Sequence, residues 1–276
     1  MKNSLTQEEK DYLIGQLEEL IGTKPFFYLK FCSEEKFAQD VCNGDFYGNT
    51  AEYFRKKEIE SAERGQGDQF ELILPLKTEK VSMFDYETGK LVAVFEGGNA
   101  KFQYKDDDII PIVCFVGIPI REMELIEADE THAVFRFPFS VEEYSTMKEC
   151  FGAYCVVLSA QELEQRIETI CRTSECDYIF DAVEYCCQNR IDRVRAFVEG
   201  SKKRFLYKNE DLEYQREYRL AVAVEMPEDH FLHFGKLENA KILSTDTLQN
   251  MAFSIEYTSH IKENTNGTEK IDKGGH

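Results

Sequence analysis

The chain has 276 residues and carries 33 basic against 52 acidic side chains, which gives a formal net charge of −19. This length can bury a sizeable core in one large domain or two small ones without a stabilising cofactor. The negative charge repels phosphate, so we expect no direct binding to nucleic acid. No apolar run approaches the roughly 18 residues of a membrane span, and we expect no membrane association.

The first 60 residues predict three helices and one strand. Thr6 and Glu9 form a capping box in front of a helix that ends at Gly22. Residues 25–31 predict a short buried strand, and a second helix runs from Ser33 to about residue 44. A third helix begins at Thr50, and its expected core-facing side chains are Tyr53, Phe54 and Ile59.

Between residues 70 and 140 the apolar pattern changes to the period of strands. Turn sequences at 86–89 and 97–99 separate the first strands, which favours a β-meander. The apolar run 109–120, interrupted by Pro111 and Pro119, suits a strand that is buried on both faces. A further strand is predicted at 131–139.

The second half alternates helices with strands. Ser140 and Ser159 occupy N-cap positions in front of helices, with a strand at 154–158 between them. We therefore expect one α+β domain over 1–261, built on a mixed, largely antiparallel sheet with a central β-meander and flanking helices, followed by a flexible polar tail at 262–276. The remaining strands are predicted at 177–184, 219–224, 240–243 and 253–257.

Metal and nucleophile chemistry find little support in the sequence. The nine cysteines are odd in number and form no C-x-x-C pair, and Cys114 lies inside an apolar run. These features predict free thiols in a reducing cytoplasm, with a disulfide to a second subunit as the alternative. His230 and His233 have a three-residue spacing, but no cysteine pair completes a zinc motif, and we expect no metal.

The most acidic segment is 71–150, with 8 basic and 16 acidic residues. Such a surface attracts a basic protein partner, including one that itself binds nucleic acid. Solubility alone is the simpler explanation of the charge. The expected partner-binding residues are Asp106, Asp107, Asp108, Glu122 and Glu124.

The segment 214–224 combines polar chemistry with strand periodicity. As a strand, it places Gln215, Glu217 and Arg219 on one face. Alternate residues on a face lie about 7 Å apart, so an amide and a carboxylate there can jointly hold a ribose-like polyol. The alternative is a structural ion pair between Glu217 and an arginine. The opposite, core-facing side chains are Tyr214, Tyr218, Leu220, Val222 and Val224.

A glycine turn at 65–68 precedes a second polar element. The turn presents Asp68, and Glu71 is expected to face back towards a cation, whereas a phosphate loop is disfavoured because no G-K-[ST] follows. We expect these elements to supply a structural polar cluster, and the sequence leaves open whether the turn at 65–68 meets the strand at 213–219 in space. Its predicted members are Arg64, Asp68, Glu71 and Arg219.

Gln215-x-Glu217 is similar to the acidic motif of ADP-ribosyltransferases. The resemblance implies NAD as cofactor, Gln215 holding the ribose, and Glu217 as the catalytic carboxylate that stabilises an oxocarbenium-like centre when nicotinamide leaves. That family also has an arginine or histidine on an early strand. This chain offers only Tyr28 or Lys30 there, which departs from the pattern.

Two patches together resemble an uncharacterised bacterial and phage family with an early Asp-x-Phe-Glu and a late Glu/Gln-x-Glu-Tyr-Arg element. They are residues 64–71 and residues 207–220. The usual Asn-Asp-Pro-Phe-Glu form is altered, with Gly67 for the asparagine and Gln69 for the proline. The resemblance implies a setting in phage and defence-associated genes.

Two functions follow as hypotheses. The first is a non-enzymatic acidic protein-binding module without a cofactor, of the type of a phage inhibitor that occludes the basic nucleic-acid-binding surface of a bacterial defence complex. It would act in the host cytoplasm, and homo-oligomerisation is compatible with it. The second is an NAD-dependent ADP-ribosyltransferase-like enzyme that uses Glu217 and Gln215.

Overall fold

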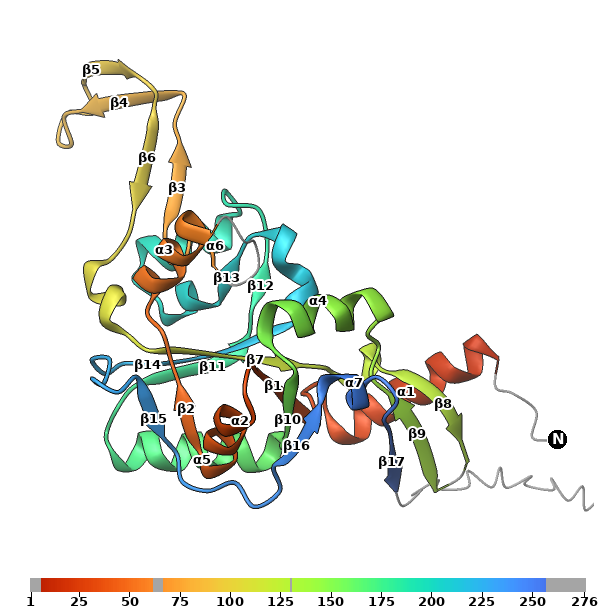
Figure 1. Ribbon diagram of the computed structural model, residues 1–276. Helices are drawn as coiled ribbons and strands as arrows, with labels where there is room; N and C mark the ends of the chain where they lie inside the picture. Colours follow the sequence, from red (N-terminus) through yellow and green to blue (C-terminus); the bar gives the residue numbers. More distant parts are fainter. Residues whose placement is uncertain (1–5, 62–66, 130, 257–276) are drawn as a thin grey trace, which may run out of the picture.

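A six-stranded antiparallel sheet forms the centre of the computed structural model, which describes residues 6–61, 67–129 and 131–256 (Figure 1). With the helices around it, the sheet confirms the α+β class and its largely antiparallel character. The predicted tail at 262–276 lies outside the described residues. In spatial order the strands are β11 (Tyr178–Ala182), β14 (Glu217–Val222), β7 (Ile112–Gly117), β1 (Phe27–Cys32), β10 (Tyr154–Ser159) and β16 (Lys241–Ser244).

The helix starts follow local capping chemistry. Thr6 and Ser140 each accept a hydrogen bond from the amide three residues on, and Glu9 and Glu143 close the two capping boxes. Ser159 caps its helix as predicted. The helices are α1 (Gln7–Ile21), α2 (Glu35–Asn43), α3 (Ala51–Ser61), α4 (Val141–Phe151), α5 (Ala160–Thr173), α6 (Ile191–Val198) and α7 (Thr245–Leu248).

The two faces of the sheet are covered differently. On one face, α2 and α5 pack against Tyr28, Phe115 and Leu220 in a single apolar cluster. On the other face the cover is divided into two clusters. One joins Leu29 and Phe135 to α1, α4 and α7, and the other is built mainly on α3, α6 and the β7–β14 end of the sheet. The division leaves a place on this face where polar side chains reach the sheet.

The strands between residues 70 and 140 do not form one central meander. Only β7 enters the central sheet, because its apolar run requires cover on both faces. Period-two alternation predicts where strands lie but not which strand pairs with which, so the pairings were decided by tertiary contacts. The other pairings are β3 (Leu74–Lys77) with β6 (Asn99–Phe102), β4 (Lys80–Phe84) with β5 (Leu91–Glu96), and β8 (Glu124–Ala128) with β9 (His132–Arg136) and β17 (Ala252–Glu256).

Helix α3 turns a different face inward from the one predicted. Tyr53 is 43% exposed and Ile59 is 73% exposed, whereas Phe54 packs against the apolar cluster as expected. The inward position next to Phe54 belongs to Arg55, which donates to the carbonyl oxygen of Glu71 at 2.8 Å and pairs with Asp108 at 2.6 Å. These long-range polar contacts outweigh the burial of Tyr53 and Ile59.

Short elements complete the chain and surround the site. They are β2 (Asp45–Tyr47), β12 (Glu184–Tyr185), β13 (Tyr207–Lys208), β15 (Phe231–His233) and the 3-10 helices η1 (Lys105–Ile109), η2 (Ile120–Glu122), η3 (Lys202–Leu206) and η4 (Glu210–Gln215). Among the residues that the structure describes, no helix combines the length and apolarity needed to cross a membrane.

Candidate functional site

Gln215 and Glu217 meet, but not as neighbours on one strand. Gln215 ends η4, Arg216 adopts a left-handed conformation with φ of 44°, and β14 begins only at Glu217. Lys208, from β13, joins the two side chains: its Nζ donates to Gln215 Oε1 at 3.0 Å and to Glu217 Oε2 at 2.6 Å. The predicted strand face is therefore wrong for Gln215, and a lysine nine residues before Glu217 brings the pair together.

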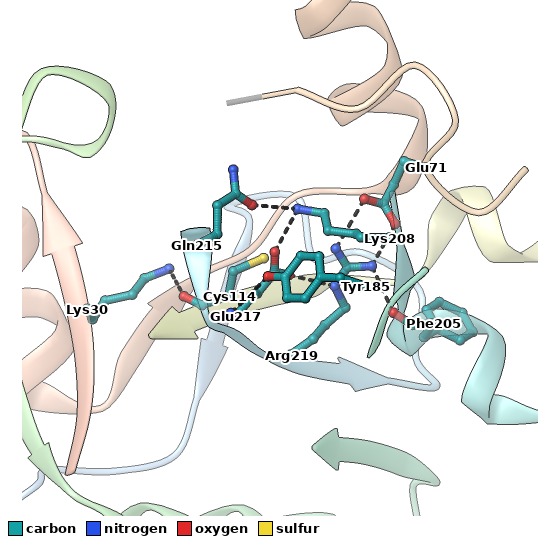
Figure 2. A network of polar contacts seen from close by, with 9 residues as sticks. All are labelled: Lys30, Glu71, Cys114, Tyr185, Phe205, Lys208, Gln215, Glu217 and Arg219. Atoms are coloured by element: carbon teal, nitrogen blue, oxygen red, sulfur yellow. Dashed lines mark hydrogen bonds and ion pairs between the residues drawn. The ribbon is translucent and has the colours of Figure 1, made fainter. Parts of the chain in front are cut away.

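Arg219 extends these contacts into a buried ionic network (Figure 2). Its Nε donates to Glu217 Oε1 at 2.8 Å, and its two terminal nitrogens hold both oxygens of Glu71 at 2.6 and 3.1 Å. Arg219 is 1% exposed, and its Nη1 also donates to the carbonyl oxygen of Phe205 at 2.8 Å. We call Glu71, Lys208, Gln215, Glu217 and Arg219 the ionic network.

Glu217 and Lys208 keep their charges at physiological pH. Burial opposes the ionisation of Glu217, but Arg219 and Lys208 together outweigh it and hold the pKa of this carboxyl far below its usual range. Burial likewise opposes the charge on Lys208, and Glu217 outweighs it, so the pKa of the lysine is raised. Glu217 is therefore a fixed negative charge and not a proton donor.

Cys114 lies beside the network as a neutral thiol. Burial and then the charge of Glu217 raise the pKa of Cys114 to about 12. Its backbone carbonyl accepts a hydrogen bond from Lys30 Nζ at 2.8 Å (Figure 2). Because the thiolate is the nucleophilic form, a thiol with this raised pKa is not activated as a nucleophile.

Asp68 is a buried carboxyl beside the network. It is 5% exposed, and its Oδ1 accepts a hydrogen bond from the amide of Phe70 at 2.9 Å. Burial, and then the neighbouring charge of Glu71, raise the pKa of Asp68 to about 6. A carboxyl with this pKa exchanges its proton near neutrality, as a general acid or base requires.

A pocket of about 410 Å³ lies in front of the network. Its walls include Asp68 and members of both apolar clusters on this face, and Lys30 contributes from β1. Tyr47 and Tyr53 line it and are 48% and 43% exposed, so the pocket reaches the surface. This volume is in the range of small-molecule sites, and the charged wall faces a cavity instead of being closed off by apolar side chains.

The two patches that carry the family resemblance meet at this pocket. Arg219 and Glu71 are 148 residues apart in the chain and form a bidentate ion pair. Gly67 makes the approach possible, because a Cβ there would overlap the backbone of α3 at Phe54 and Glu58. Asp68, Glu71 and Arg219 thus lie close together, and Arg64, the fourth residue nominated for the polar cluster, lies outside the described residues.

The acidic residues nominated for partner binding are largely engaged with arginines of the same chain. Asp107 is buried and holds Arg204 at 2.6 and 2.7 Å, whereas Asp106 is exposed. The other contacts are Asp108 with Arg55, Glu122 with Arg216, and Glu124 with Arg136. Residues 105–109 and β8 also lie at opposite ends of the molecule, so the five carboxylates do not form one surface (Figure 1).

No sequence pattern assigns a role to Lys208 or to Tyr185, whose Oη accepts a hydrogen bond from the amide of Glu217 at 3.0 Å. The available signal was the position of Lys208 within the late patch of the resemblance. All nine cysteines are free, and the residues described here contain no group of three or more potential metal ligands. His233 instead contacts Asp45 at 2.7 Å.

The pocket thus combines a fixed carboxylate, an amide, a carboxyl that titrates near neutral pH and aromatic side chains. This set can hold a polyol beside a planar ring, with Asp68 available for proton transfer. Comparison of the chain with protein-family models, with curated proteins and with solved structures finds no match.

Proposed function

We propose that this protein binds a ribose-bearing nucleotide, with NAD as the first candidate, in the pocket in front of the ionic network. The observation that carries the proposal is that Gln215 and Glu217, joined by Lys208, line a pocket that reaches the surface. The carboxylate of Glu217 accepts hydrogen bonds from Lys208, Arg219 and the thiol of Cys114. A carboxylate has about four acceptor positions, which leaves one for a ribose hydroxyl.

The aromatic part of the pocket suits the rest of such a ligand. Tyr53, on α3, and Tyr47, on β2, line the pocket with partly exposed side chains. Planar bases stack on aromatic rings independently of their exact identity. Lys30 Nζ, which donates to a single backbone carbonyl among its described contacts, is placed to meet a phosphate or hydroxyl oxygen.

The same arrangement supports turnover of NAD. The bond between the ribose C1′ and the nicotinamide nitrogen breaks, and its electron pair leaves with nicotinamide. The negative charge of Glu217 stabilises the oxocarbenium-like centre that develops. A hydroxyl of water or of an acceptor then bonds to C1′ and gives its proton to Asp68, whose pKa of about 6 suits a general base.

Calorimetric titration with NAD tests binding, and release of nicotinamide measured by chromatography tests turnover. Tyr53→Ala should weaken binding at least several-fold, because it removes a partly exposed ring that lines the pocket. Tyr12→Ala, at an exposed tyrosine of α1 outside the pocket, is the matched control. Equal affinity of the two variants, or no heat with NAD, would contradict the proposal.

Capture of a basic protein, as a phage inhibitor of a defence complex would do, is the second candidate, and the net charge of −19 favours it. The internal arginine contacts of four of the five nominated carboxylates reduce its support. Glu217→Gln separates the two functions, because it should abolish NAD turnover and leave partner capture from a lysate intact. Capture that weakens between low and high salt would support the second candidate.

A further inference from the structure

Residues 74–102 form an arm that extends from the body of the molecule (Figure 1). It consists of β3 and β6 at the base and of the β4–β5 hairpin at the end. Leu74 is fully buried and anchors the base. Asp85 orders the tip, because its Oδ1 accepts hydrogen bonds from the amide and the hydroxyl of Thr88, both at 2.7 Å. The arm is therefore an ordered projection and not an irregular loop.

The arm exposes an unusual amount of apolar surface. Nine of the twenty large hydrophobic side chains that are exposed among the described residues belong to it. Single exposed apolar residues need no explanation, but a contiguous group marks an interaction surface. The nine are Val81, Met83, Phe84, Tyr86, Leu91, Val92, Val94, Phe95 and Phe102.

One face of the hairpin has only apolar side chains. Val81 lies opposite Phe95 and Met83 lies opposite Ala93, and residues directly opposite each other in antiparallel strands share a face. We call Val81, Met83, Ala93 and Phe95 the arm face. The other side of the hairpin includes the pairs Lys80–Glu96 and Ser82–Val94 and is mixed in character. A two-stranded hairpin is marginal by itself, so cover on the arm face would stabilise it.

Charge indicates what covers this face. The arm contains four lysines and four acidic residues and is neutral, whereas the whole chain has a net charge of −19. A basic partner is attracted to the acidic body and gains nothing from an uncharged apolar face. The arm face of a second copy offers an apolar surface of the same size. Because the arm projects from the body (Figure 1), contact through the arms would keep two acidic bodies apart.

We propose that two copies of this chain associate through their arm faces. The same four residues of each chain pack against one another about a two-fold axis, in an isologous interface. The two hairpins then form a small sandwich, with the sheets about 10 Å apart. The proposal does not depend on the pocket or on its ligand.

Sedimentation velocity of the full chain over a range of concentrations tests the proposal. The wild-type chain should be a dimer that becomes more stable as salt is raised, because salt screens the repulsion between the acidic bodies. Met83→Glu places two like charges in the interface and should give a monomer. Val94→Glu adds the same charge on the other side of the hairpin, and Met83 and Val94 are equally exposed at 48%, so this control should remain dimeric.

Circular dichroism and thermal unfolding of both variants verify that they are folded. A wild-type chain that is monomeric at every concentration and salt overturns the proposal. So does a dimer that Met83→Glu leaves intact, or one that Val94→Glu disrupts equally, because the contact would then lie elsewhere on the chain.

Discussion

The ionic network and the arm are opposite exceptions to the usual relation between polarity and burial. Five polar or charged side chains are buried at the start of β14 and around it, whereas the arm, in which apolar side chains are concentrated, exposes them to solvent. Burying a charge costs free energy unless it is paired, and exposing an apolar face gains nothing unless something covers it. Sites where a sequence departs from its folding rules are where function is expected.

The pocket and the arm also differ in how far apart in the chain their contacting residues are. The pocket is formed by segments that are far apart in the chain and meet only in the folded protein, such as Glu71 and Arg219. The arm is formed by 29 consecutive residues paired as nested hairpins. We therefore expect the network to depend on the stability of the whole fold, and the arm to depend mainly on what it contacts.

The largest expected effect is at Arg219. Arg219→Ala leaves Glu71 and Glu217 buried without their shared partner, and loss of one member of a buried ion pair costs about 3–5 kcal/mol of unfolding free energy. Urea denaturation measures the change. Arg136→Ala removes an exposed bidentate pair with Glu124 and should cost far less. Similar losses in the two variants would show that the network does not contribute as a buried unit.

The next effect is on the pH dependence of stability. The pKa of Asp68 is raised to about 6 in the folded protein, above its value near 3.8 in the unfolded chain, so the folded state binds the proton more tightly. Proton binding by Asp68 therefore stabilises the folded state below about pH 4, and this stabilisation is lost as the pH rises to about 6. Replacement by asparagine, which carries no charge, should remove a destabilisation of about 2–3 kcal/mol at neutral pH.

Urea denaturation of wild type and Asp68→Asn at a series of pH values measures this difference. The gain in stability should be large at pH 7 and small at pH 4. Asp106→Asn, at an exposed aspartate, is the control. If the difference in unfolding free energy between wild type and Asp68→Asn is the same at pH 4 and pH 7, the buried environment described for Asp68 is contradicted.

A smaller effect is expected where the network meets the backbone. Tyr185→Phe removes the hydroxyl that accepts a hydrogen bond from the amide of Glu217, and the loss should cost about 1 kcal/mol. The change also affects the position of Glu217, so the proposed turnover of NAD should fall in this variant as well. If Tyr185→Phe keeps both the wild-type stability and the wild-type turnover of NAD, Tyr185 does not support Glu217.

The smallest effect on folding is expected in the arm. Phe95→Ser removes an exposed aromatic side chain of the arm face and should change the unfolding free energy of the monomer by less than about 0.5 kcal/mol. It should nevertheless weaken the association between two copies. Denaturation at low protein concentration, with sedimentation at high concentration, measures both. A large loss of monomer stability would show that Phe95 supports the fold itself.

Local chemistry explains which parts of the fold were predictable. The capping box at Thr6 and Glu9, the caps at Ser140 and Ser159, and the strand periods of β4, β5 and β14 all depend on neighbours within a few residues. The candidate site was predictable to the extent that Gln215, Glu217, Asp68 and Glu71 were selected. Lys208 and the pocket were not, because no local pattern encodes a contact across the fold.

The sequence by itself determined the α+β class, most helix and strand positions, the negative charge and the residues that carry unusual chemistry, because these follow from composition, periodicity and short-range hydrogen bonds. Tertiary structure alone decided that β7 pairs with β14 and β1, that strands β3 to β6 pair outside the central sheet, that Arg55 takes an inward position on α3, and that Lys208 joins Gln215 to Glu217. The physical reason is that pairing and burial are chosen by competition between distant segments for the same partners, and this competition is settled only when the chain is folded.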